Sequence, residues 1–189
     1  PSVALMTASG GTVAGQTFTF TFSDPQGWQD LDVVNVLVNN FLDGRYACYL
    51  AYSRPLNVLY LVNDPGTALL PGLVLNGAGS VANSQCAVNG ALSSAVGSGN
   101  NLTLTLNLAF PAGFAGNRIF YGAARDLLAN NSGWKAIGTW TVPGGTAAQL
   151  TAGPLAPAQG TGSTVTFTAT FTNTNGWNQL GVLNVLIND

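Results

Sequence analysis

Two stretches of this chain repeat one another at an offset of 149 residues. Residues 16–40 read QTFTFTFSDPQGWQDLDVVNVLVNN, and residues 165–189 read VTFTATFTNTNGWNQLGVLNVLIND. The dipeptide Gly27-Trp28 matches Gly176-Trp177. A fixed internal period is typical of modular arrays. The chain is therefore expected to hold one repeated unit and the opening of the next.

The period divides the chain into a complete unit and an incomplete one. Residues 1–143 are predicted to form the complete unit, which is long enough to bury a core. A short linker is expected at 144–149, where Pro143 is followed by two glycines. Residues 150–189 are expected to supply the first three strands of a second unit.

Composition narrows the range of functions. Charged residues make up 6% of the chain, against about a quarter in an ordinary globular protein. A net charge of -2 with five scattered basic residues argues against nucleic acid as a partner. No apolar run approaches the roughly 18 residues of a membrane span, so no insertion into a membrane is expected. The chain has no His and no Glu, which removes most acid–base schemes, so neither an enzyme nor a cofactor is predicted.

Alternation with a period of two residues dominates the pattern. Three Phe and three Thr alternate over 17–22, and Leu alternates with Thr or Asn over 102–108. Such segments are half-buried strands with one wet face. We expect one common core that includes Phe18, Phe20, Phe22, Leu104, Leu106 and Leu108. Strands are predicted near 3–8, 16–23, 32–39, 46–53, 57–62, 84–88, 101–110, 118–125 and 136–142, which indicates an antiparallel β-sandwich.

The segment 121–142 resembles the closing hairpin of bacterial immunoglobulin-like domains. Ala124-Arg125-Asp126 ends an apolar strand, Asn130-Asn131-Ser132 supplies the turn, and Trp140 lies in the final strand. The resemblance implies an immunoglobulin-like sandwich arranged in tandem repeats. It also implies a role in stalks, surface layers or fibres of large secreted proteins. The unit is longer than the usual domain of about 100 residues, and the excess at 41–100 implies an extended sandwich.

Two cysteines, Cys48 and Cys86, are both in the first unit. A disulfide between them would close a loop of about 38 residues, for which the chain-entropy model gives about 4 kcal/mol. Two buried thiols are the alternative. The chain lacks His and has no metal-type cysteine spacing, so a metal centre is not expected there. We expect the disulfide, and with it an extracellular or cell-surface location.

Other candidate sites are weighed against turn and surface roles. Asp30 with Asp32 could form a carboxylate pair of the glycosidase kind, but a turn role is favoured. Ser84 has no base to activate it. An isopeptide bond from Lys135 is not expected. Calcium is a minor alternative at Asp24, Asp30, Asp32 and Asp43, which lie near strand ends, but no metal site is predicted.

The aromatic residues are a candidate sugar-binding face, although packing is the simpler role. A polysaccharide is therefore the alternative partner, in a carbohydrate- or cell-binding module. Both copies carry a Trp after Gly, which favours an architectural role for Trp28 and Trp177. The aromatic pool is Trp28, Trp134, Trp140, Tyr46, Tyr49, Tyr52, Tyr60 and Tyr121.

The second copy supplies apolar residues that three strands alone cannot bury. The strand at 33–39 is also apolar on both faces, which predicts cover from the segment 41–100 or from a neighbouring unit. We therefore expect a head-to-tail contact between copies. Continuation of the chain is favoured over donation of strands to a neighbouring subunit. The expected assembly residues are Leu37, Phe167, Phe171, Leu183, Val185, Leu186 and Ile187.

Overall fold

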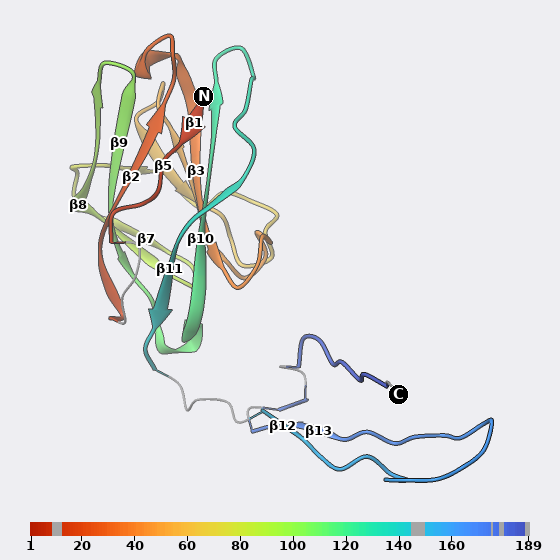
Figure 1. Cartoon of the computed structure of the whole chain (residues 1–189). Coiled ribbons are helices and arrows are strands. Elements are labelled where there is room, and N and C mark those ends of the chain that lie inside the picture. Colours follow the sequence, from red (N-terminus) through yellow and green to blue (C-terminus); the bar gives the residue numbers. More distant parts are fainter. Residues whose placement is uncertain (9–12, 145–149, 175, 178–179, 188–189) are drawn as a thin grey trace. The chain divides into compact units, whose positions relative to one another are not determined.

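The computed structural model describes residues 1–8, 13–144, 150–174, 176–177 and 180–187. The chain forms two compact units, Pro1–Gly144 and Gly145–Asp189. The first unit is an antiparallel sandwich of two sheets (Figure 1). This confirms the all-β class and the two-layer arrangement predicted from alternation. Of the linker expected at 144–149, residues 145–149 lie outside the described residues.

One sheet is built around the two strands with the clearest alternation. β2 pairs with β9 from Gly15↔Ala109 to Ser23↔Asn101 without interruption. Because side chains alternate across a strand, the Phe of β2 and the Leu of β9 enter the core while Thr faces water. The strand order is β1-β2-β9-β8-β7, with bounds Ser2–Val3, Gly15–Ser23, Asn101–Ala109, Ala87–Ser98 and Ser80–Ala82.

The other sheet contains the long pair of β3 and β10. They pair from Ile119↔Asn39 to Asp126↔Leu31, with one irregularity next to Asp126. The hairpin of β10 and β11 is the closing hairpin expected from the sequence. The strand order is β11-β10-β3-β4-β5-β6, with bounds Lys135–Val142, Gly116–Asp126, Leu31–Asn39, Cys48–Ser53, Val58–Leu61 and Leu73–Val74.

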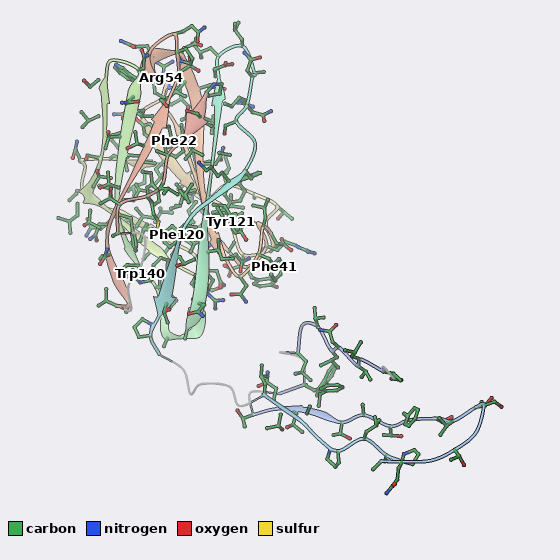
Figure 2. All side chains as sticks on the ribbon, in the orientation of Figure 1. Phe22, Phe41, Arg54, Phe120, Tyr121 and Trp140 are labelled. Carbon is green, nitrogen blue, oxygen red and sulfur yellow. A yellow bond between two sulfur atoms is a disulfide. The ribbon has the colours of Figure 1, made fainter. Side chains whose placement is uncertain are left out.

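The core lies between the two sheets and is rich in aromatic rings. Phe18 contacts Phe120 at 5.0 Å and Trp140 at 4.9 Å between ring centroids. The Trp140 indole donates a hydrogen bond of 2.7 Å to the Val13 carbonyl. Phe22 and Phe120 lie inside the sandwich, whereas Phe41 is exposed (Figure 2). The predicted core residues are confirmed as buried: Phe18, Phe20, Phe22, Leu104, Leu106 and Leu108.

The structure corrects the predicted strand at 84–88. Residues 83–86 form a turn in which the Asn83 side chain accepts hydrogen bonds from the Gln85 and Cys86 amides. The strand β8 begins at Ala87 and passes through Asn89-Gly90, which the sequence suggests is a turn. Its pairing with β9 is shifted between Asn89 and Ser94. The extra residues of this bulge reconcile a turn-like sequence with a continuous strand.

The second unit contains a small antiparallel sheet of two strands, β12 (Leu150–Ala152) and β13 (Phe171–Asn173). An isolated bridge joins Ala156 to Thr168. The sequence predicts three strands in 150–189, whereas the described residues of this unit form these two short strands. In the first unit β2 is held along its length by β9, and the second copy ends before any counterpart of β9.

Candidate functional site: the repeated corner and its open face

The corner that follows β2 joins the two sheets of the first unit. Gly27 adopts φ +107°, and the short 3-10 helix η1 (Trp28–Asp30) follows it. A residue with a side chain is strained at this φ, which explains a glycine before Trp28. The Gly27 amide donates to the Asp24 carbonyl at 3.1 Å, which closes the turn.

Trp28 docks this corner onto the hairpin of β8 and β9. The Trp28 amide donates to the Gly99 carbonyl at 3.1 Å, and the Asp24 amide donates to the Asn100 carbonyl at 2.9 Å. The indole lies directly on Gly97, where an added Cβ would be 2.1 Å from its ring atom Cδ2. The absence of a side chain at Gly97 therefore leaves the space that the indole occupies. Trp28 has a packing role in this unit.

Replacing Gly97 tests this packing of the Trp28 indole. Gly97→Ala is expected to lower the free energy of unfolding by about 1–3 kcal/mol, because the indole must move from a packed position. Urea denaturation followed by tryptophan fluorescence measures the loss. Gly113→Ala is the matched control, since an added Cβ there has no atom within 4 Å. Equal stability of both variants would show that the indole is free to move.

The same corner recurs in the second copy. Gly176 adopts φ +104°, and its amide donates to the Asn173 carbonyl at 3.0 Å. The Leu180 amide donates to the Trp177 carbonyl at 3.0 Å, as the Leu31 amide does to the Trp28 carbonyl. Trp177 is nonetheless 83% exposed. These turn bonds therefore form even though Trp177 lacks the packing against a glycine that holds Trp28.

Strand pairing also recurs at the same offset of 149 residues. In the first unit Ser2 pairs with Ser23 and Val3 with Phe22. In the second unit the pairs at the matching positions are Thr151↔Thr172 and Ala152↔Phe171. The isolated bridges match as well, since Thr7↔Thr19 corresponds to Ala156↔Thr168. The two copies therefore share one backbone register over both strands.

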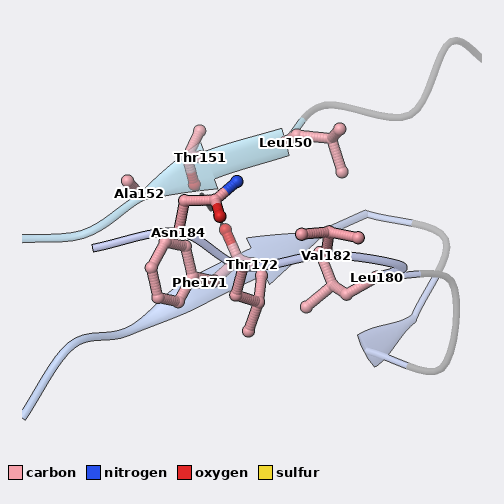
Figure 3. Close-up of a pocket in the computed structure, with 9 residues that line it drawn as sticks. Leu150, Thr151, Ala152, Phe171, Thr172, Leu180, Val182 and Asn184 are labelled. Atoms are coloured by element: carbon pink, nitrogen blue, oxygen red, sulfur yellow. Dashed lines mark hydrogen bonds between the residues drawn. The ribbon is translucent and has the colours of Figure 1, made fainter. Parts of the chain in front are cut away.

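The second copy presents an open apolar face. A groove is lined by the two strands and by the segment after the corner (Figure 3). The matching residues of the first unit are core residues: Phe22 corresponds to Phe171, Leu31 to Leu180 and Val34 to Leu183. Phe171 is half-buried in the second unit, while the other assembly residues predicted there are exposed: Phe167, Leu183, Val185, Leu186 and Ile187.

Leu37 differs from the other residues expected at an assembly contact. It is only 2% exposed, on the face of β3 that points away from the main core. Its cross-strand neighbours are Tyr49 and Tyr121, and Tyr49 contacts Trp134 at 5.7 Å between ring centroids. Burial also raises the pKa of Tyr49. The cover of this face therefore comes from within the first unit, and Leu37 offers no exposed contact there.

The expected disulfide is present between Cys48 and Cys86. It links β4 of one sheet to the residue before β8 of the other, and both cysteines are buried. Asn83, which the sequence analysis did not single out, anchors the same turn. Its side-chain amide donates to the Ala47 carbonyl at 2.9 Å and to the Val62 carbonyl at 3.0 Å.

The four acids weighed as calcium ligands do not gather as one group, because only Asp24 and Asp30 lie close together. Asp32 pairs with Arg125 at 2.6 Å, and Asp43 pairs with Arg45 at 2.5 Å. Hydrogen bonds from the Arg45 side chain and backbone lower the pKa of Asp43 to about 2. Asp32 and Asp43 are therefore surface ion-pair partners, which contribute little to stability.

Asp24 and Asp30 instead meet Asp126, which the sequence analysis placed only in the closing hairpin. One carboxylate oxygen from each lies within 4.8 Å of the others. Burial would raise the pKa of Asp126, but hydrogen bonds from the Asn130 side chain and from the Asn130 and Leu128 amides outweigh it and lower the pKa. The chain separation of about a hundred residues explains why no local motif predicts the cluster.

The remaining candidates keep surface or packing roles. Lys135 is exposed at the start of β11, and Ser84 is exposed beside Asp64, whose side chain accepts from the Ser84 amide. The aromatic residues considered for a sugar-binding face differ in exposure: Tyr52 and Trp140 are buried, while Tyr46 is exposed. Phe41, which is close to Tyr46 in sequence, is also exposed.

A scan against models of protein families finds no match, and a search of curated proteins finds no significant similarity. Within the described part of the chain, no helix is long and apolar enough to cross a membrane.

Proposed function

We propose that this chain is a structural module of an extracellular array, in which immunoglobulin-like sandwich units follow one another head to tail as a stalk or filament. The observation that carries the proposal is the shared register of the two copies. Ser2↔Ser23 and Thr151↔Thr172 are the same pair one period apart. A segment that adopts the backbone of the first unit's opening strands is suited to open a second unit of the same kind.

The strand order supports the immunoglobulin-like part of the proposal. In such sandwiches one sheet has the order A-B-E-D, and the other contains strands G, F and C, extended by C′ in the variable type. Here β1-β2-β9-β8 corresponds to the first and β11-β10-β3-β4 to the second. The short strands β5, β6 and β7 are additions from the segment 41–100. The disulfide links β4 to the residue before β8 and closes the loop that contains these additions, whereas the usual inter-sheet bond of antibody domains joins strands B and F.

The chemistry of the chain supports an extracellular structural role over catalysis. A disulfide persists in oxidising environments. Threonine-rich strand faces and few charges suit a durable scaffold, and the absence of His and Glu from the sequence leaves few groups for acid–base catalysis.

The partner of the open face is a segment equivalent to residues 41–143 of this chain. In the first unit that segment supplies β9, which pairs with β2 along its length. It also supplies Gly97, against which the Trp28 indole packs. The first unit already contains its own β1, β2 and β3, so a strand donated by a neighbour has no free position there. Continuation within the same chain is therefore the arrangement we propose.

Completing the second unit tests this arrangement. Asp189 matches Asn40, so a chain of the present 189 residues followed by a copy of residues 41–143 should form two sandwiches. We expect amide hydrogen exchange in 165–187 to become slow in the longer chain, because the strands gain partners and burial. Mass spectrometry of the peptides measures this protection, and electron microscopy of longer arrays should then show linear particles.

Two controls accompany the experiment. A chain that carries the same added residues in shuffled order should leave 165–187 in fast exchange, and residues 1–144 alone should stay folded and monomeric. Fast exchange of 165–187 in the completed chain would overturn the proposal. The same conclusion would follow if the 189-residue chain alone proved to be a compact monomer with its second copy docked on the first unit.

A further inference from the structure

Exposed apolar side chains gather in the loop between β3 and β4. Phe41 is 60% exposed, Leu42 is 48% exposed and Tyr46 is 65% exposed. β3 ends beside the start of β10 and the end of β11, so this loop lies toward the end of the sandwich where β11 finishes. Figure 2 shows Phe41 toward that end and Arg54 toward the other. We call residues 40–47 the exit loop.

Polar interactions order the exit loop. The Asn39 side chain, which is buried, donates to the Asp43 carbonyl at 2.9 Å. The Arg45 guanidinium forms an ion pair with the Asp43 carboxylate at 2.5 Å. The Tyr46 amide donates to the Asp64 carbonyl at 2.7 Å, which ties the loop to the turn that follows β5. An ordered loop loses little conformational entropy when its apolar side chains enter a contact.

The opposite end of the same sheet also exposes apolar side chains. Leu127 is 54% exposed and Leu128 is 81% exposed, both at the tip of the hairpin of β10 and β11. Leu56 is 64% exposed in the turn between β4 and β5. The hairpin tip is ordered too, because the Asp126 side chain accepts from the Leu128 and Asn130 amides. We call Leu56, Leu127 and Leu128 the entry patch.

The first and last strands place these two surfaces at opposite ends of the path of the chain. β1 starts where Ser2 pairs with Ser23, just before the corner that is bonded to the hairpin tip through the Leu127 amide. β11 starts at Lys135, after that tip, and ends at Val142 at the other end of the sandwich (Figure 1). In a head-to-tail array, the end with the exit loop therefore faces the entry patch of the following unit.

The linker expected between units limits how far apart these surfaces can be. Even a fully extended chain spans at most about 20 Å over residues 144–149. A short link holds two surfaces at an effective concentration of about a millimolar. Because interfaces between domains of one chain can be small, a few apolar side chains from each unit suffice for a contact.

We propose that, in an array of these units, the exit loop of one unit packs against the entry patch of the unit that follows it. The inference rests on the proposed array and names its contact surface. Apolar side chains that cluster on a surface mark sites of interaction. The exit loop carries no net charge, because Asp43 and Arg45 pair, so it lacks the basic cluster that draws a protein to an anionic lipid surface.

Hydrogen exchange in a two-unit chain tests the contact. That chain is the present 189 residues followed by a copy of residues 41–143, and the 189-residue chain alone is the reference. We expect the amides of the first exit loop to exchange at least tenfold more slowly in the two-unit chain, because the loop becomes covered. A peptide that starts within β3 contains this loop and differs in mass from its counterpart in the second unit, since the two copies differ in sequence there.

Variants of the entry patch identify the partner of the loop. Leu127→Ser with Leu128→Ser, introduced only in the added copy, should return exchange of the first exit loop to within about twofold of the reference. Leu56→Ser in the added copy, which changes a separate turn, should weaken the protection in the same direction. Leu92→Ser in the added copy is the matched control, because Leu92 is 60% exposed in β8 of the other sheet and should leave the protection unchanged.

Failure of the contact is distinguishable from failure of the array. If residues 165–187 stay in fast exchange in the two-unit chain, the second unit has not formed and both proposals are wrong. If 165–187 are protected but the exit loop exchanges as in the reference, or if both sets of Ser variants keep its protection, only the contact is wrong. Co-sedimentation of the 189-residue chain with vesicles of equal parts phosphatidylcholine and phosphatidylglycerol, abolished by Phe41→Ser, would assign the loop to a membrane surface and overturn the contact.

Discussion

Phe20→Ala is expected to lower the free energy of unfolding of the first unit by about 3–5 kcal/mol. Phe20 is wholly buried at the centre of β2 and lies 6.1 Å from Phe120 between ring centroids. Truncation removes the apolar surface of the ring and leaves a cavity, because the paired strands around it cannot collapse into the space. Urea denaturation of residues 1–144 measures the change.

The control for Phe20 is a neighbour on the opposite face of the same strand. Thr21→Val keeps the branched side chain but removes a hydroxyl from a partly exposed position, so stability should change by about 0.5 kcal/mol or less. A loss below about 1 kcal/mol for Phe20→Ala would mean that the sandwich interior repacks freely.

Alternation allowed the inner faces to be predicted, because the period of two in β2 and β9 is regular over the whole strand. The closing hairpin was predictable too, since Asp126 and Asn130 form a local turn with hydrogen bonds inside it. In these segments sequence and tertiary structure require the same side-chain pattern.

The edges of the sheets were not predictable in the same way. β6 and β7 have only two and three residues, too few to show a period. Gly90 looks like a turn residue, yet it lies in β8, where an added Cβ would be 2.8 Å from the Gly77 carbonyl oxygen. This glycine permits a close approach of two backbone segments, which no local pattern reveals.

The functional features also differ in how far the sequence could predict them. The repeat indicated which apolar residues of the second copy need cover, because their counterparts face the core of the first unit. Leu37 was expected at an assembly contact, but it is covered within the first unit, and that cover by neighbouring strands depends on tertiary packing. The carboxylate cluster joins Asp24 to Asp126 across the sandwich, and only the fold brings those positions together.

The second large effect is expected from the disulfide. Replacing both Cys48 and Cys86 by Ala should lower the free energy of unfolding by about 4 kcal/mol, because the unfolded chain regains the entropy of a loop of 38 residues. For a unit of this size the loss corresponds to a fall in Tm of roughly 10–15 °C. Calorimetry of residues 1–144 measures it.

Reduction separates the cross-link from the packing of the cysteines. The unsubstituted unit treated with a reductant should lose most of the same stability while keeping both side chains, and the double variant should not respond to the reductant. The closed loop contains β5, β6 and β7, which are held by few strand pairs, so their amides should lose protection from hydrogen exchange before those of β2 and β9. If reduction leaves the Tm within about 2 °C, the added strands are stable without the cross-link, and the disulfide does not hold the extended part of this sandwich.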